Sequence, residues 1–100
     1  MISLADQSAS VTVNLGEKVT IRVEESLSSG LLWSQPLIDG DGVTLQTSRS
    51  LTDDDTRIEY REFVFQTHRS GRNRISSSLK QAGIEKGVKK LYMVVDVTEP

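Results

Sequence analysis

The stretch Lys18–Glu24, which reads KVTIRVE, decides the fold because its hydrophobic residues recur at every second position. Val19, Ile21 and Val23 alternate with polar residues, and a β-strand places successive side chains on opposite faces. The stretch therefore predicts a strand with one buried face. A strand of this kind needs a sheet beside it and a second layer to cover its apolar side.

Further segments with the same period lie on both sides of this strand. Upstream, Val11, Val13 and Leu15 alternate, and residues 14–17 supply the Asn and Gly of a tight connection, either a hairpin turn or a turn that changes sheet. Downstream, strands are expected at Val43–Thr47, Ile58–Thr67, Arg74–Leu79 and Leu91–Val97. The last of these is apolar on both faces, which is typical of a central strand.

The segment Ile58–Thr67 predicts two local irregularities. Phe63 and Phe65 share a face with Arg61, but Tyr60 is out of phase with them, so we expect a bulge near Arg61 or Glu62. The residues that follow, 67–72, contain Ser and Gly between two strand patterns. They predict the tip of a hairpin.

The series of short strands, with turn signals between them and no helical period, predicts an all-β protein. We expect an immunoglobulin-like antiparallel β-sandwich of about seven or eight strands, with a small closed barrel as the alternative. A chain of 100 residues fits one domain over residues 1–100.

Composition excludes several classes of site and leaves the compartment undetermined. The chain has no cysteine, which excludes disulfides, a thiol nucleophile and a thiolate zinc site. No window approaches 18 consecutive apolar residues, so no membrane span is expected. The opening residues lack a basic segment followed by an apolar run, so a signal peptide is either absent or already removed. The protein is expected to be periplasmic or secreted in the second case and cytoplasmic otherwise.

The stretch Ser26–Trp33, SLSSGLLW, joins a turn to a strand. Small hydroxyl residues and Gly30 are turn formers, whereas the only tryptophan of the chain is a large ring that strands bury. We interpret Trp33 as a core residue that anchors the preceding loop.

Taken together, these motifs resemble the chagasin-type inhibitors of papain-like cysteine peptidases. The similar elements are the Gly16-Glu17 turn before the alternating strand, the run of two hydroxyl residues, Gly30 and an apolar residue ahead of Trp33, the Phe63-x-Phe65 pair and the final apolar strand. The resemblance covers nearly the whole chain. It implies an immunoglobulin-like sandwich that carries three peptidase-binding loops at one end.

What the resemblance implies for function is a non-enzymatic, non-covalent inhibitor that occludes the active-site cleft of a papain-like cysteine peptidase. Small side chains at Ser28 and Ser29 would let the backbone enter a narrow cleft. The implied partner-binding residues are Leu27, Ser28, Ser29, Gly30 and Leu31 in the first loop, Asp55 and Arg57 in the second, and Gln81, Ala82 and Gly83 in the third. No cofactor, metal, nucleic acid or membrane is implied, and a monomer is expected.

Three departures from the pattern of that family keep a second hypothesis open. The Asn-Pro that begins the first loop of the family is Ser26-Leu27 here, no glycine lies in 53–59, and Arg-Pro-Trp of the third loop is replaced by Gln-Ala-Gly at 81–83. The alternative is an immunoglobulin-like binding or assembly module without peptidase inhibition.

Other polar residues receive ordinary structural interpretations. His68 lies beside Arg69 in a turn, and no Gly-x-Ser-x-Gly elbow is present, so a catalytic triad is not expected. The acidic runs at 39–42 and 53–55 lack the spacing of a calcium loop and are interpreted as turns. The arginines at 69, 72 and 74 are interpreted as a solvated surface, because no aromatic platform for bases lies beside them in the sequence.

Overall fold

The computed structural model describes residues 2–3, 8–25, 30–81 and 89–99, and these residues form strands and turns without a helix. The strands are β1 (Ile2–Ser3), β2 (Ser8–Asn14), β3 (Lys18–Glu24), β4 (Leu31–Trp33), β5 (Leu37–Asp39), β6 (Val43–Thr52), β7 (Glu59–Thr67), β8 (Gly71–Gln81) and β9 (Lys89–Thr98). Strand β3 has the bounds that the alternation of the sequence predicts.

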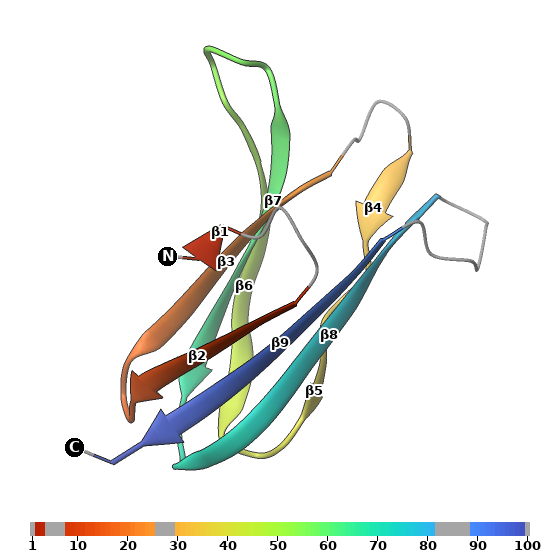
Figure 1. Cartoon of the computed structure of the whole chain (residues 1–100). Helices are drawn as coiled ribbons and strands as arrows, with labels where there is room; N and C mark the ends of the chain where they lie inside the picture. Colours follow the sequence, from red (N-terminus) through yellow and green to blue (C-terminus); the bar gives the residue numbers. More distant parts are fainter. Residues whose placement is uncertain (1, 4–7, 26–29, 82–88, 100) are drawn as a thin grey trace.

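Two sheets face each other and form a sandwich (Figure 1). One sheet has the order β1-β3-β7-β6, and the other has the order β2-β9-β8-β4, with β5 also paired to β8. Strands β4 and β5 pair with successive parts of β8, so together they act as one interrupted edge strand. The predicted two-sheet sandwich is confirmed, with one difference in strand direction: the β1–β3 and β2–β9 pairs are parallel.

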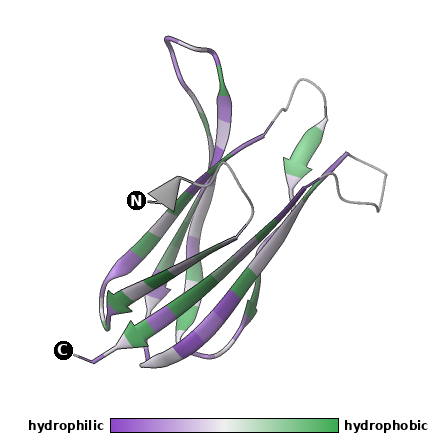
Figure 2. Ribbon diagram, viewed as in Figure 1, coloured by the Kyte–Doolittle hydropathy of each residue, from purple (hydrophilic) through white to green (hydrophobic). Residues whose placement is uncertain are grey.

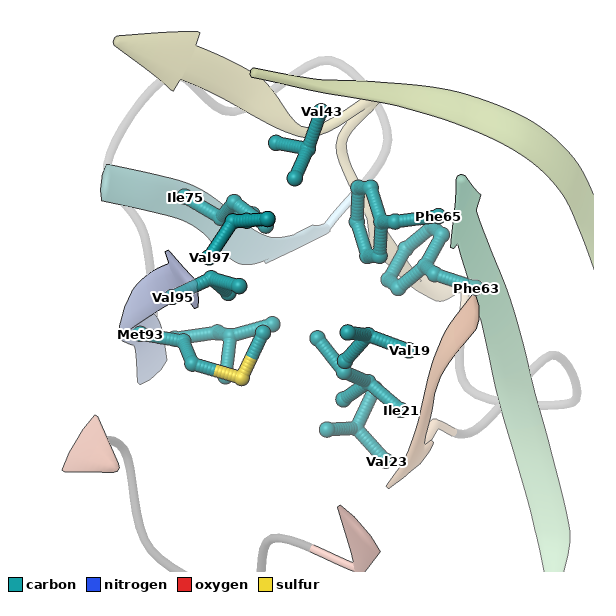
Figure 3. Close-up of a cluster of buried hydrophobic side chains, with 11 residues drawn as sticks. Val19, Ile21, Val23, Val43, Phe63, Phe65, Ile75, Met93, Val95 and Val97 are labelled. Carbon is teal, nitrogen blue, oxygen red and sulfur yellow. The ribbon is translucent and has the colours of Figure 1, made fainter. Parts of the chain in front are cut away.

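The core lies between the sheets and comes from the period-2 positions of the long strands. In Figure 3, Ile21, Phe63 and Phe65 of one sheet point toward Met93 and Val95 of the other. The buried cluster consists of Val19, Ile21, Val23, Val43, Phe63, Phe65, Ile75, Leu91, Met93, Val95 and Val97. Burial of these side chains is the dominant favourable term in folding such a chain.

One prediction about how strands connect is wrong. Residues 67–72 are not a hairpin tip, because β7 and β8 belong to different sheets. Gly71 has a left-handed φ of 132°, and a turn residue of this kind serves a sheet-crossing connection as well as a hairpin. The connection at residues 14–17 likewise changes sheet, which is one of its two predicted forms.

The expected bulge in β7 lies in the neighbouring strand instead. Strand β7 pairs with β3 without interruption, and the register shift falls between Leu45 and Thr47 of β6. The extra residue lets Leu45 and Ser48, three positions apart, pair with Phe65 and Phe63 on the inner face. Tyr60 needs no bulge, because it lies on the opposite face of β7 from Arg61.

One end of the sandwich, here called the closed end, is held by short hydrogen bonds between segments distant in the sequence. The N–H of Gly42 donates to Oδ1 of the buried Asn73 at 2.9 Å, and the N–H of Leu15 donates to the carbonyl of Thr98 at 2.8 Å. The N–H of Gly16 donates to Oγ1 of Thr67 at 2.9 Å. These bonds tie the connections at this end to nearby strand ends.

Candidate functional site

The opposite end, here called the loop end, brings together the bases of three connections, 25–31, 52–59 and 81–89 (Figure 1). The N–H of Glu25, just after β3, donates to the carbonyl of Glu59 at 3.0 Å, where β7 begins. In the other sheet, Leu31 at the start of β4 is the partner of Gln81 at the end of β8. The three loops of the predicted site therefore start from neighbouring strand ends.

Trp33 ties the two sheets together at this end. Its indole N–H donates to the carbonyl of Glu24 at 2.7 Å, which links β4 to the last residue of β3. The ring is partly buried and packs against the core cluster, so it is an edge anchor rather than a fully enclosed core ring. Such a bond fixes both strands that flank the first loop.

Gly30 lies between this anchor and the first loop. Its φ is 72°, in the left-handed region that glycine adopts at no steric cost, and a Cβ placed there would meet nothing within 4 Å. Both Gly30 and Leu31 are only partly buried. The end of the first loop therefore faces open space.

The second connection is a hairpin whose tip is ordered by Asp53 and exposes mostly hydrophilic residues (Figure 2). Oδ1 of Asp53 accepts from the N–H of Asp55 at 2.9 Å and of Thr56 at 3.2 Å. Arg57 has a φ of 62° and donates its N–H to the carbonyl of Asp53 at 2.8 Å. A non-glycine residue in this region is uncommon, so Arg57 takes the backbone conformation that a glycine would normally supply.

A buried polar cluster, here called the Glu25–Arg61 cluster, supports the first two connections. The Glu25 side chain has no exposed surface, and its Oε1 lies 3.2 Å from Nη2 of Arg61. Ser50 donates its hydroxyl to the same oxygen at 3.2 Å, and Arg61 donates from Nη1 to Ser48 at 3.3 Å. A buried carboxylate requires such partners, because an unpaired one would be costly.

The sequence interpretation missed this cluster, although the pattern contains it. Glu25 continues the inward alternation of Val19, Ile21 and Val23, and Arg61 shares the face of Phe63. Opposite charges at inward positions of paired strands indicate an ion pair inside the sandwich.

A second ion cluster lies on the outer face of the four-stranded sheet. Glu62 accepts from Nη2 of Arg22 at 2.9 Å and from Nε of Arg49 at 2.8 Å, across its two neighbouring strands. The hydrogen bond from Arg22, followed by that from Arg49, holds the pKa of Glu62 below its usual value. This cluster contributes to the sheet rather than to the loop end.

Of the predicted partner-binding residues, the structure describes half. Gly30, Leu31, Asp55, Arg57 and Gln81 all lie at the loop end, on the three connections that the resemblance assigned to them. The others, Leu27, Ser28, Ser29, Ala82 and Gly83, lie outside the described residues.

The described residues show what the loop end can do chemically. His68 lies at the closed end, where its Nε2 is 2.7 Å from Oγ1 of Thr44, far along β7 from the loops. Within the described ranges, no group of three or more His, Asp or Glu side chains is placed to hold a metal ion. The same part of the chain contains no helix of the length and apolarity needed to cross a membrane. The loop end exposes Asp55, Arg57 and Gln81, polar side chains that suit binding.

Comparison with known proteins identifies the fold. No protein-family profile and no curated protein sequence matches the chain. Among solved structures, the cysteine protease inhibitor EhICP2 from Entamoeba histolytica is similar with a TM-score of 0.82 and 13% identity, over 97% of this chain and 92% of that one. Amebosin has a TM-score of 0.74 at 13% identity, over 97% and 95% of the two chains.

A third similar structure is that of PbICP-C in complex with falcipain-2. Its TM-score is 0.67 at 15% identity, over 97% of this chain and 98% of that one. The three structures confirm the fold that the resemblance to chagasin-type inhibitors predicted. The chain therefore shares a β-sandwich fold with these three proteins over 97% of its length.

Proposed function

We propose that this protein inhibits papain-like cysteine peptidases without covalent chemistry, by placing its loop end in the active-site cleft. The observation that carries the proposal is the convergence of three connections at one end of a sandwich whose fold is that of cysteine protease inhibitors. PbICP-C, one of the similar proteins, is bound to falcipain-2 in its structure.

In this proposal the segment Leu27–Leu31 is the central wedge. Asp55 and Arg57 contact the cleft from one side, and Gln81, Ala82 and Gly83 contact it from the other. Binding orders little of the supporting frame, because the Trp33 bond to Glu24 already fixes the strand ends. A preorganised binding surface loses less conformational entropy on association.

The chain supplies no reactive group for this task. It contains no cysteine, and its single histidine is bonded to Thr44 at the other end of the molecule. Inhibition therefore depends on shape and on hydrogen bonds from the loops. Reversible, competitive kinetics are expected.

The test is the replacement of Gly30 by Trp. The open space around Gly30 lets the fold accept an indole, but that ring would obstruct entry into a narrow cleft. We expect the inhibition constant against a papain-type enzyme to rise by about 100-fold or more, which is the size of a hot-spot loss. The left-handed backbone costs the variant about 1–2 kcal/mol of stability.

Gly16→Trp is the matched control, because Gly16 also has a positive φ, 96°, and a Cβ added to it would also meet nothing within 4 Å, but it lies at the closed end. It should inhibit like the parent protein. Equal inhibition by Gly30→Trp and the parent would remove the first loop from the mechanism. A folded parent protein that inhibits none of several papain-like enzymes would instead support the binding-module alternative.

A further inference from the structure

A pocket of about 390 Å³ opens between the two sheets, beside the core and below the loop end. Trp33 lines it from the five-stranded sheet, and Leu45, Ser48, Arg61 and Phe63 line it from the four-stranded sheet. Binding sites for small molecules have volumes of roughly 300–1,000 Å³. The pocket is therefore large enough for one small ligand.

At β6 the pocket is open to solvent, because the residue at the inward-facing position, Ser48, is small and exposed. Ser48 pairs with Phe63 on the inner face of β6, where the alternation of a sandwich strand normally places a large apolar side chain. The register shift between Leu45 and Thr47 brings Ser48 to this face. The space that a core side chain would fill thus remains open to a ligand.

The walls favour an aromatic ring. Trp33 and Leu45 are only partly buried, and they provide an aromatic and an aliphatic wall from opposite sheets. Phe63 is 1% exposed, so it closes the floor of the pocket and offers almost no surface of its own to a ligand. Aromatic pairs gain stabilisation beyond the burial of area when rings meet edge to face or offset.

The polar side of the pocket favours an uncharged hydrogen-bond acceptor over an anion. The Arg61 guanidinium already faces the fully buried carboxylate of Glu25, which neutralises its charge. A second anion at this site would be opposed by that carboxylate. Arg61 nevertheless has five N–H donors, and its contact with Ser48 is long at 3.3 Å, so a carbonyl oxygen can accept from it.

We propose that this inter-sheet pocket binds a small uncharged aromatic molecule that carries one hydrogen-bond acceptor. The ring lies against Trp33 and Leu45, and the acceptor meets the Arg61 guanidinium. The site is separate from the loops that the proposed function assigns to the peptidase, and it can be tested without any peptidase.

The single tryptophan gives the test a specific signal, because this chain of 100 residues has one indole N–H group. Acetophenone, with a ring and a carbonyl, is the probe, and the ¹H–¹⁵N spectrum is recorded as it is added. A saturable shift of the Trp33 indole signal is expected at millimolar concentration. Benzoate, which replaces the neutral acceptor by an anion, should bind at least about tenfold more weakly. Toluene, which has no acceptor, should also bind more weakly.

Ser48→Phe tests the location, because its ring would fill the space that Ser48 leaves open. We expect the acetophenone shift to be lost in this variant, while its thermal unfolding remains cooperative. Thr47→Phe adds the same ring to the exposed outer face of β6, opposite Val64, and should keep the shift. An unsaturable shift in the parent, equal binding of benzoate, or an undiminished shift in folded Ser48→Phe would overturn the proposal.

Discussion

The two ends of the sandwich connect the same sheets by different means. At the closed end, backbone N–H groups of turns donate to side chains or carbonyls of nearby strand ends, as Gly42 does to Asn73 and Leu15 does to Thr98. At the loop end, the links come from the Trp33 indole and from the Glu25–Arg61 cluster. They hold the first connection at its base, at Glu24 and Glu25. The closed end therefore fixes its turns by contacts between distant segments, whereas at the loop end the described links between distant segments hold the bases of the loops, and Asp53 orders the tip of the second connection from within the hairpin.

The closed end is tightly packed around Gly40 and Gly42 but not around Gly16 and Gly71, where an added Cβ would meet nothing within 4 Å. A Cβ on Gly42 would lie 2.6 Å from the carbonyl oxygen of Arg69 and 2.8 Å from Nδ2 of Asn73, whereas a Cβ on Gly30 would meet nothing within 4 Å. The tight packing around Gly42 leaves no room for a partner, whereas the open space around Gly30 does leave room for one. Substitutions at the closed end should therefore change stability, and substitutions at the loop end should change inhibition.

The largest effect on stability is expected for Gly42→Ala. The added methyl group overlaps the backbone of residue 69, which cannot move without opening the turn, so the free energy of unfolding should fall by about 2–3 kcal/mol. Urea unfolding measures the loss, and the inhibition constant of the folded fraction should stay unchanged. Gly71→Ala is the control, because Gly71 has a positive φ but open surroundings, and it should lose only about 1–2 kcal/mol. An unchanged stability of Gly42→Ala would show that crowding does not decide stability at this end.

Trp33→Phe should affect both properties. Phenylalanine keeps most of the packing against the core but cannot donate to the carbonyl of Glu24, so about 1 kcal/mol of stability should be lost. The first loop then loses its anchor, and the inhibition constant should rise about tenfold because ordering the loop costs more on binding. Tyr92→Phe, on the exposed outer face of β9, should change neither value. Unchanged inhibition by Trp33→Phe would mean that the anchor does not preorganise the loop.

Asp53→Ala should have a smaller effect that is confined to the second connection. It removes the carboxylate that accepts from the N–H groups of Asp55 and Thr56, at a cost of about 0.5–1 kcal/mol. Inhibition should weaken a few-fold. Asp54→Ala removes an exposed neighbouring charge without touching these bonds. If both variants weaken inhibition equally, the charge of the tip matters rather than its order.

Much of the fold could be predicted from the sequence, because alternation directly reports which face of a strand is buried. The inward residues of β3 and the shared face of Ile75, Ser77 and Leu79 are recognisable in this way, and all of them are buried. The second half of β6 was not predicted. Residues 48–52 are polar on both faces apart from Leu51, and their strand conformation comes from pairing with β7.

Connections could not be predicted as well as strands. The residues between Thr67 and Gly71 have the composition of any tight turn, and whether the chain returns to the same sheet depends on tertiary packing. The predicted bulge is likewise found in β6 and not in β7, because the pairing of the two strands decides which of them carries the extra residue. At the loop end, the resemblance predicted that the three loops lie together. The Glu25–Arg61 cluster beneath them was missed, because its polar residues occupy inward positions of the strand pattern.

The smallest effect on stability and inhibition is expected for a substitution at Glu62, which lies between the two ends. This substitution is a reference for the substitutions at either end. Arg22 and then Arg49 lower the pKa of this carboxyl, so the folded protein holds its charged form more strongly than the unfolded chain, whose value is about 4.3. The contribution of Glu62 to the free energy of unfolding is complete at a pH above its pKa in the unfolded chain. It is lost as the pH falls through its lower pKa in the folded protein. Glu62→Gln should therefore lose about 0.5–1 kcal/mol at pH 7, the range of partly exposed ion pairs, and less at pH 3. Urea unfolding at both pH values measures this, with Glu24→Gln as a control that removes a carboxylate outside the cluster. Because Glu62 contacts neither end, its inhibition constant should match that of the parent; a change would mean that the outer face of the four-stranded sheet is coupled to the loops.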